Sequence, residues 1–398
     1  MIWVLFVKSP VAFLVLLFAA LTAGIAHQSE AAPDALQASS LVEHYANDIY
    51  ASTQATGMAM IVIDANQRIY SSRGVVRPGS QSAPQKDSVV RIASLTKLLT
   101  SELLVKMSEQ GVVSLHDPLN RYAPAGKQSL SGAGKRITLL NLATHTSGLP
   151  REQPGGKPNR PVFVWPTFNQ RWNWFSGAQL KVMPGTQAAY SNVAFDLLGD
   201  ALSRAGKQPY PVLLKQQITR PLGMKDTTFT PSPDQCRRLM IPAKGASPCM
   251  NTLAAIGSGG LYSTPDDMGR WMQQFLSSDI YTRTGQVDRM QTMIYQRPQL
   301  NKVEGMDVPG KATALGLGWV YMAPEANRPG IIQKTGGGGG FITYIAMAPQ
   351  YSVGVFIVVS RSPDTHFKAM SDGVHGLITE LIGNSSGSAH LAATLMAE

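Results

Sequence analysis

The sequence is poor in cysteine and in charged residues, and beyond its first residues it lacks long apolar runs. Only two cysteines occur among 398 residues, and 15% of the residues are charged against 44% that are hydrophobic. This composition excludes a mainly disordered chain. No later stretch approaches the roughly 20 apolar residues that a membrane-spanning helix needs. The sequence therefore predicts a globular protein of one large domain or two interleaved domains.

The first 26 residues are predicted to be a secretory signal. They combine one cation, Lys8, with an apolar stretch over residues 11–21 and small residues near Ala26. This order is typical of an export signal that is cleaved near Ala26 or a few residues later. An uncleaved anchor is the alternative, because residues 2–7 are also apolar. Both readings predict export to the periplasm, with residues 27–398 as the mature protein.

The two cysteines, Cys236 and Cys249, lie in the Pro/Gly/Ser-rich stretch PSPDQCRRLMIPAKGASPC. No histidine or second cysteine pair lies nearby, so a zinc site is not expected there. In an oxidising compartment such a pair is predicted to form a disulfide, worth ~3 kcal/mol on the chain-entropy model. We expect no metal and no cofactor.

The formal net charge of +10 favours polyanionic partners. Export argues against nucleic acid. Anionic lipid headgroups, with peripheral association at the inner membrane, and acidic cell-wall polymers then remain as candidates. A basic surface that only aids solubility is an equally open alternative.

The pattern of apolar residues predicts an α+β fold. Strand signals cluster at both chain ends, whereas residues from about 115 to 310 show helices and long Pro/Gly loops. We therefore predict an α/β sandwich, in which an antiparallel sheet built from both ends is flanked by helices and carries an inserted, mainly helical lobe. The chain has no internal repeat and no coiled-coil heptads. The predicted helices are residues 40–53, 94–111, 193–206 and 371–382, and the predicted strands are residues 58–64, 68–74, 315–322, 341–348 and 353–360.

The first candidate motif is Ser94-Leu95-Thr96-Lys97, at the start of a predicted helix. Residues three apart on a helix share a face, so the Lys97 amine can approach the Ser94 hydroxyl. A hydroxyl needs a base to become a good nucleophile, and a lysine of lowered pKa can serve. The alternative role for Ser94 is that of a helix N-cap.

The second candidate motif is Tyr190-Ser191-Asn192, in a loop just before a predicted helix. A tyrosine near lysines can move protons, and Asn192 can bind a substrate amide. A buried tyrosine and an Asn N-cap are the plainer readings, since Tyr45-Ala46-Asn47 has the same form by chance.

The third candidate motif is Lys334-Thr335-Gly336, followed by four more glycines and Phe341. A P-loop has its Lys and Ser/Thr after the glycines and before a helix, whereas here they precede the glycines and a strand. Phosphate binding is thus disfavoured. Glycines on a strand let another backbone approach, so a peptide could pair with this edge while Lys334 and Thr335 hold a carboxylate. We interpret Gly338 to Gly340 as room for a bulky cross-linked substrate.

Together the three motifs resemble the serine β-lactamase and penicillin-binding protein superfamily, whose signatures begin with S-x-x-K and end with K-T-G. Tyr-x-Asn in place of Ser-Asp-Asn is similar to the class C branch and its DD-peptidase relatives. The stretches ATHTSGLP, PGTQAAYSN, RPLGMKDTTF and GSGGLYSTPDDM extend the resemblance over nearly the whole mature chain. The sequence is most similar to bifunctional DD-carboxypeptidase/DD-endopeptidases of the bacterial cell wall, which also bind β-lactams.

The resemblance implies a role for each motif residue. Ser94 would be the acylated nucleophile, while Lys97 and Tyr190 would share the proton transfers. Peptidoglycan peptides and β-lactams would be the partners. The implied substrate-binding residues are Asn192, Lys334, Thr335 and Gly336, and the implied oxyanion hole consists of the backbone N–H groups of Ser94 and Gly337. Class C β-lactamase, esterase and non-catalytic penicillin-binding sensor are the alternatives.

Two other features have plainer interpretations. A catalytic His145 is disfavoured, because His145 lies in a helix-end turn of a type that the resembled family uses structurally. The aromatic cluster between Trp165 and Trp174 could stack on glycans or touch a membrane, but local packing under a long loop is favoured.

Overall fold

The computed structural model describes residues 33–65, 67–154, 164–276, 285–326 and 328–395. The predicted signal, residues 1–26, lies outside these ranges. Among the described residues, no helix has both the length and the apolar character for a transmembrane span.

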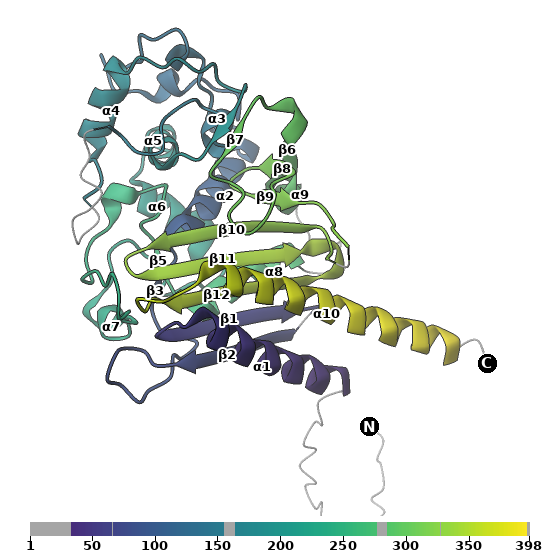
Figure 1. The fold of residues 1–398 in the computed structure, drawn as a ribbon. Coiled ribbons are helices and arrows are strands. Elements are labelled where there is room, and N and C mark those ends of the chain that lie inside the picture. Colours follow the sequence, from purple (N-terminus) through teal and green to yellow (C-terminus); the bar gives the residue numbers. More distant parts are fainter. Residues whose placement is uncertain (1–32, 66, 155–163, 277–284, 327, 396–398) are drawn as a thin grey trace, which may run out of the picture.

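An eight-stranded antiparallel sheet forms the centre of the molecule, in the order β2-β1-β12-β11-β10-β9-β8-β6 (Figure 1). Strands from the two ends of the chain meet in its middle, because Gly57 of β1 pairs with Ser360 of β12 and Asp64 with Val353. The predicted sheet from both chain ends is therefore confirmed. The strands are β1 (Gly57–Asp64), β2 (Gln67–Gly74), β6 (Met293–Gln296), β8 (Ala314–Gly316), β9 (Val320–Met322), β10 (Ile331–Gly338), β11 (Phe341–Ala348) and β12 (Val353–Ser360).

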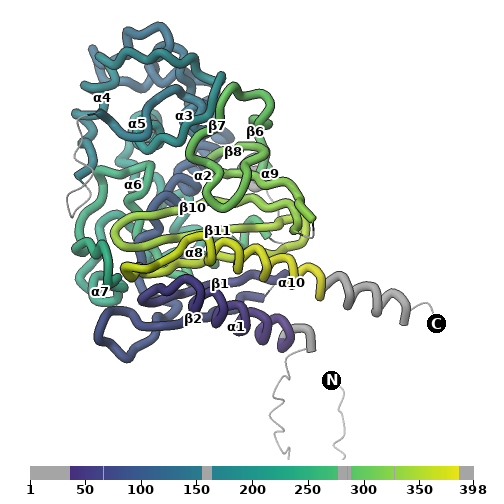
Figure 2. The backbone as a smooth tube through the Cα atoms, in the orientation of Figure 1, coloured from purple at the N-terminus to yellow at the C-terminus, as the bar shows by residue number. Residues whose placement is uncertain are grey.

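Helices cover both faces of the sheet, which makes the fold the predicted α+β sandwich. On one face α1 (Pro33–Thr53) and α10 (Phe367–Leu395) lie side by side, as Figure 2 also shows. On the other face lie α2 (Thr96–Glu109) and α8 (Pro265–Leu276). The period-2 alternation of strand residues divides the core in two, since Met58 and Met60 pack toward α1 and α10 while Ala59 and Ile61 pack toward α2 and α8.

The stretch from about 115 to 310 contains most of the remaining helices and four short strands. Its helix α8 packs on β1 and β12, and its strand β6 joins the main sheet, so this stretch is not wholly separate from the sheet. The helices are α3 (Leu139–Ala143), α4 (Phe168–Gly177), α5 (Asn192–Ala205), α6 (Tyr210–Leu214), α7 (Pro233–Arg237) and α9 (Gly285–Gln291). Two small sheets pair β3 (Val90–Arg91) with β5 (Tyr262–Ser263), and β4 (Ala188–Ala189) with β7 (Val303–Glu304).

The predicted strand at residues 315–322 is two strands in the structure. Gly318 has a φ of +77°, a left-handed conformation that a strand cannot contain, and the chain reverses there between β8 and β9. The prediction read one apolar run as one strand and missed the turn glycine within it.

The glycine run ends in a tight turn between β10 and β11. Gly339 and Gly340 have φ values of +59° and +84°, as a two-residue hairpin turn requires. A Cβ on Gly340 would lie 2.2 Å from Cγ of Pro242 and 2.8 Å from the carbonyl oxygen of Lys244. The interpretation of Gly340 as open room for substrate is therefore wrong, because a neighbouring loop already fills that space.

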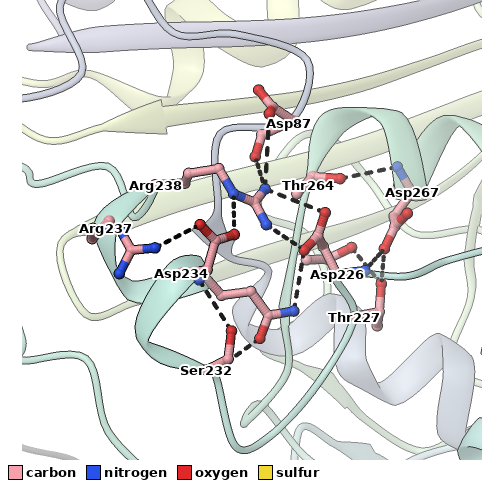
Figure 3. Close-up of polar contacts among 11 residues, drawn as sticks. Asp87, Asp226, Thr227, Ser232, Asp234, Arg237, Arg238, Thr264 and Asp267 are labelled. Atoms are coloured by element: carbon pink, nitrogen blue, oxygen red, sulfur yellow. Dashed lines mark hydrogen bonds and ion pairs between the residues drawn. The ribbon is translucent and has the colours of Figure 1, made fainter.

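That neighbouring loop is closed by a disulfide between Cys236 and Cys249, as predicted. Its α7 end is fixed by Arg238, whose guanidinium donates to Asp226 at 2.6 Å and to Asp234 at 3.2 Å (Figure 3). The Arg238 carbonyl oxygen accepts from the Val89 N–H, just before β3. The loop is thus tied at one end to the segment that leads into Ser94 and packs elsewhere on the β10–β11 turn.

Candidate active site

Ser94 lies in a single 3-10 turn, Ala93–Leu95, that connects β3 to α2. Leu95, not Ser94, is the N-cap residue of α2, so the capping role considered for Ser94 is not what the structure shows. Ala93 has a φ of +48°, which is unfavourable for a residue with a Cβ and is typical of strained functional turns. The turn leaves Ser94 partly exposed while its two neighbours are buried.

Lys97 is fully buried one turn further along, with Nζ close to three oxygens. It lies 3.2 Å from Oγ of Ser94, 2.7 Å from Oδ1 of Asn192 and 2.6 Å from the carbonyl oxygen of Ser258. Burial lowers the pKa of Lys97 to about 7, against the opposing charges of Asp196 and Glu152. A substantial fraction of the amine is therefore neutral near pH 7.

The Tyr190 hydroxyl also donates to Ser94 Oγ, at 2.5 Å. Three basic side chains surround the Tyr190 ring, with Nζ of Lys97 at 4.8 Å, Nζ of Lys334 at 4.7 Å and the guanidinium of Arg151 at 4.7 Å from its centroid. Positive charge at these positions favours negative charge on a substrate group bound nearby.

Asn192 is the first residue of α5, which Ser191 caps through its hydroxyl. Nδ2 of Asn192 donates to Oε1 of Glu152, and Oδ1 of Asn192 accepts from Lys97. These two hydrogen bonds fix the orientation of the Asn192 amide. Burial raises the pKa of the Glu152 carboxyl. Sequence reasoning missed Glu152 and Arg151, and the available signal was their position directly after the SGLP segment.

Lys334 and Thr335 lie on β10, just beyond the residues that pair with β9. β9 pairs only with residues Ile331 to Gln333 of β10, and the Ser94 turn lies against the strand beyond them. A Cβ on Gly336 would lie 3.1 Å from the backbone nitrogen of Ser94, so glycine is needed for this approach. Gly337, the next residue, is exposed.

The same strand brings a second low-pKa lysine into the site. Burial lowers the pKa of Lys334 to about 8, and the charges of Lys97 and Arg151 act in the same direction. Ser94, Lys97, Tyr190, Asn192 and Lys334, predicted as one set, are thus brought together.

His145 contributes packing to the site. Its ring stacks on Tyr190 with centroids 4.6 Å apart, and Nδ1 accepts from the Ser191 N–H at 3.0 Å. Burial and the charges of Lys334 and Lys97 hold the pKa of His145 well below its usual range. His145 is therefore neutral, with its proton on Nε2, and its contacts are those of a structural support for Tyr190.

The aromatic cluster is partly core. Trp172 is 1% exposed and its ring meets Phe175 edge to face at 5.7 Å, whereas Trp165 and Trp174 are half-buried. At Trp172 the local-packing interpretation holds.

In the described part of the chain, no group of three or more His, Cys, Asp or Glu side chains is placed to hold a metal ion.

A serine approached by a buried lysine and a tyrosine, beside the open edge of an antiparallel strand, is the arrangement that the three motifs predicted. The chain belongs to the Beta-lactamase family, which it matches over residues 38–377.

Individual relatives are more specific. The chain is 68% identical over 347 residues to the D-alanyl-D-alanine-carboxypeptidase/endopeptidase AmpH of Escherichia coli (strain K12), covering 87% of this chain and 90% of the relative. It is 25% identical over 332 residues to a protein of Pseudomonas fluorescens named Beta-lactamase, covering 77% and 88%. A crystal structure of the Beta-lactamase/D-alanine carboxypeptidase from Yersinia pestis complexed with citrate is 56% identical, with a TM-score of 0.85 over 87% of this chain and 99% of that chain.

Proposed function

We propose that this protein is a serine-type DD-peptidase of the bacterial cell wall, acting both as a DD-carboxypeptidase on terminal D-alanine and as a DD-endopeptidase on D-amino-acid cross-links. The observation that carries the proposal is the convergence of Lys97 and Tyr190 on Oγ of Ser94. The high identity to a D-alanyl-D-alanine-carboxypeptidase/endopeptidase over most of both chains supports the substrate class.

Activation of Ser94 follows from counting the hydrogens on Lys97. A neutral amine has two N–H bonds and one lone pair. The two shortest contacts, to Asn192 Oδ1 at 2.7 Å and to the Ser258 carbonyl at 2.6 Å, end on oxygens that only accept and therefore use both hydrogens. The lone pair then faces Ser94 Oγ at 3.2 Å and takes the serine proton as the oxygen attacks the scissile carbonyl.

Tyr190 completes the proton transfer. Its hydroxyl is hydrogen-bonded to the attacking oxygen, so it can give its proton to the leaving amine as the carbon–nitrogen bond breaks and recover one from Lys97, which holds the proton taken from Ser94. The basic side chains around the site stabilise negative charge that develops on the substrate during the reaction. The acyl-enzyme is then attacked by water, with the same groups acting in reverse.

The substrate binds along β10. The edge beyond Gln333 can pair with an extended peptide, and the exposed Gly337 leaves space for it. Lys334 and Thr335 bind the terminal carboxylate, Asn192 binds a substrate amide, and the N–H groups of Ser94 and Gly337 bind the oxyanion. In a related hydrolytic mechanism, one such donor lowers the activation barrier by ~2.7 to 4 kcal/mol.

A β-lactam presents the same acyl group and carboxylate as the peptide, so it acylates Ser94 and is held covalently. The mature enzyme, residues 27–398, acts in the periplasm, where peptidoglycan and an oxidising environment for the Cys236–Cys249 disulfide coincide. Peripheral association with the inner membrane is a separate expectation, which membrane fractionation of cells with and without added salt would check.

The test is product analysis by mass spectrometry on a defined mixture of pentapeptide and cross-linked dimeric muropeptides. The wild-type enzyme is expected to release D-alanine from pentapeptides and to split dimers, and Ser94→Ala to do neither while keeping its melting temperature. Rapid cephalosporin hydrolysis without muropeptide products would indicate a class C β-lactamase instead. Turnover of short acyl esters alone would indicate an esterase, and stoichiometric penicillin labelling without any product would indicate a sensor.

A further inference from the structure

Two buried carboxylates lie on α5, one turn apart and behind the site, and the mechanism above uses neither. Asp196 and Asp200 are each 2% exposed. Asp200 forms a bidentate ion pair with Arg171 of α4, at 2.9 and 3.0 Å. Asp196 instead binds the Gly257–Ser258 turn, which contacts Lys97.

Asp196 binds the turn that supplies one of the acceptors of Lys97. Its Oδ1 accepts from the N–H groups of Gly257 at 3.0 Å and Ser258 at 2.9 Å. The carbonyl oxygen of the same Ser258 accepts from Nζ of Lys97 at 2.6 Å. Only one residue of backbone therefore separates the Asp196 carboxylate from the lysine that we place as the base.

The turn is also held from two other directions. A Cβ on Gly257 would lie 1.9 Å from the carbonyl oxygen of Phe195, so the turn packs directly on the backbone of α5. From α2, the Thr100 hydroxyl donates to the carbonyl oxygen of Gly257 at 2.9 Å. With Asp196 in place, the position of the Ser258 carbonyl is fixed by hydrogen bonds and by contact rather than by the loop alone.

We propose that Asp196 is a positioning residue for Lys97. It holds the Gly257–Ser258 turn so that the Ser258 carbonyl receives one N–H of the neutral amine and the lone pair is left facing Ser94. The inference rests on the proposed function, because it matters only if Lys97 activates Ser94. Asp196 itself touches neither the substrate nor the reacting atoms.

The charges around Lys97 determine the sign of the expected pH effect. Asp196 and Glu152 favour the protonated amine, and Arg151 disfavours it. Lys334, the Tyr190 hydroxyl and the neutral His145 also border the site. Arg171 in turn favours the ionised form of Asp196, against the burial that raises the pKa of this carboxyl. Removing the charge of Asp196 should therefore lower the pKa of Lys97.

Two substitutions separate hydrogen bonding from charge. Asp196→Asn keeps an oxygen that can accept both N–H groups but removes the charge. We expect a loss of only a few-fold in the rate of acylation by a fluorescent penicillin, and a shift of the Lys97-dependent limb of the pH–rate profile to lower pH. Asp196→Ala removes both hydrogen bonds and should slow acylation ~100-fold, the scale of a misplacement of about 1 Å.

The matched controls are Asp200→Asn and Asp200→Ala. They leave Arg171 buried without its carboxylate, so they should lower the melting temperature at least as much as the Asp196 variants. Neither should move the pH profile or slow acylation once the folded fraction is equal. Rates that follow melting temperature across all four variants would show a merely structural role and would overturn the proposal.

The remaining outcomes are also decisive. If the wild-type enzyme releases D-alanine and Asp196→Ala acylates at the wild-type rate, the proposal for Asp196 is wrong and the proposed function stands. If the wild type neither releases D-alanine nor is labelled by penicillin, both fail. Should Asp196→Ala not fold, an unshifted pH profile for Asp196→Asn would by itself overturn the proposal.

Discussion

The two faces of the central sheet both bury ionisable side chains, but they arrange them differently. On the α1/α10 face the hydroxyl of Tyr344, a residue of the apolar core, is paired with Nε2 of the half-buried His375 at 2.7 Å. On the opposite face Lys97 and Lys334 approach a partly exposed serine and tyrosine at the free edge of β10.

Burial shifts pKa values on both faces, lowering His375 to about 4 and Lys97 to about 7. A perturbed pKa alone therefore does not mark a site. The distinguishing features are a reachable nucleophile and a strand edge open to substrate.

The strongest way to break this contrast is to remove Lys97, the proposed base. Lys97→Met preserves length and apolar contact but has no lone pair and no N–H, so acylation by penicillin should fall by about 10²- to 10⁴-fold, the range for loss of general-base catalysis. Stopped-flow or gel-based labelling would measure it. The control is Lys106→Met on the same helix, whose Nζ donates to the Gln217 carbonyl outside the site and whose loss should leave the rate unchanged. Equal rates for wild type and Lys97→Met would contradict the assignment.

A pair of Tyr→Phe substitutions tests the two faces against each other. Tyr344→Phe leaves Nε2 of His375 without its partner and should lower the free energy of unfolding by ~1 to 3 kcal/mol without changing the acylation rate. Tyr190→Phe should do the reverse, slowing acylation with little change in stability. Urea denaturation and penicillin labelling of both variants give the comparison. If Tyr344→Phe slowed acylation at equal folded fraction, the two faces would be coupled.

The last expected effect is a pH dependence of the free energy of unfolding from His375. Because burial lowers its folded-state pKa to about 4, the unfolded chain binds a proton first as the pH falls below about 6.5. Stability is thus fully present above about 6.5 and is lost as the pH falls through about 4. His375→Gln should flatten this part of the stability curve in denaturant titrations. A curve of unchanged slope would show that His375 does not titrate as its burial implies.

Much of the site could be predicted because the residues proposed to react lie in short local motifs. Ser94 and Lys97 are joined by helical spacing alone, and Lys334 and Thr335 by a strand pattern. Asp196, Ser258 and Glu152 reach Lys97 only through tertiary contacts between α5, a glycine-rich turn and the segment after α3, and no spacing in one sequence encodes these contacts. The positive φ of Ala93 was equally unpredictable, because alanine rarely adopts it.

The fold was predicted where apolar strands are long and was missed where they are short. β1, β11 and β12 have clear apolar runs. β6 is a four-residue edge strand, half-buried and polar at its end, and tertiary pairing with β8 stabilises it more than its own composition does. The split between β8 and β9 depends on a single glycine.

The pairing of β1 with β12 also affects when the enzyme can become active. These neighbouring strands lie at residues 57–64 and 353–360, and β10, which carries Lys334, is connected to β1 only through β11 and β12. A growing chain therefore contains Ser94 long before it contains the strands that complete its surroundings. Folding must wait for this long-range closure, which is intrinsically slow. The topology thus delays activity, since the chain cannot assemble its active site until nearly all of it has been synthesised.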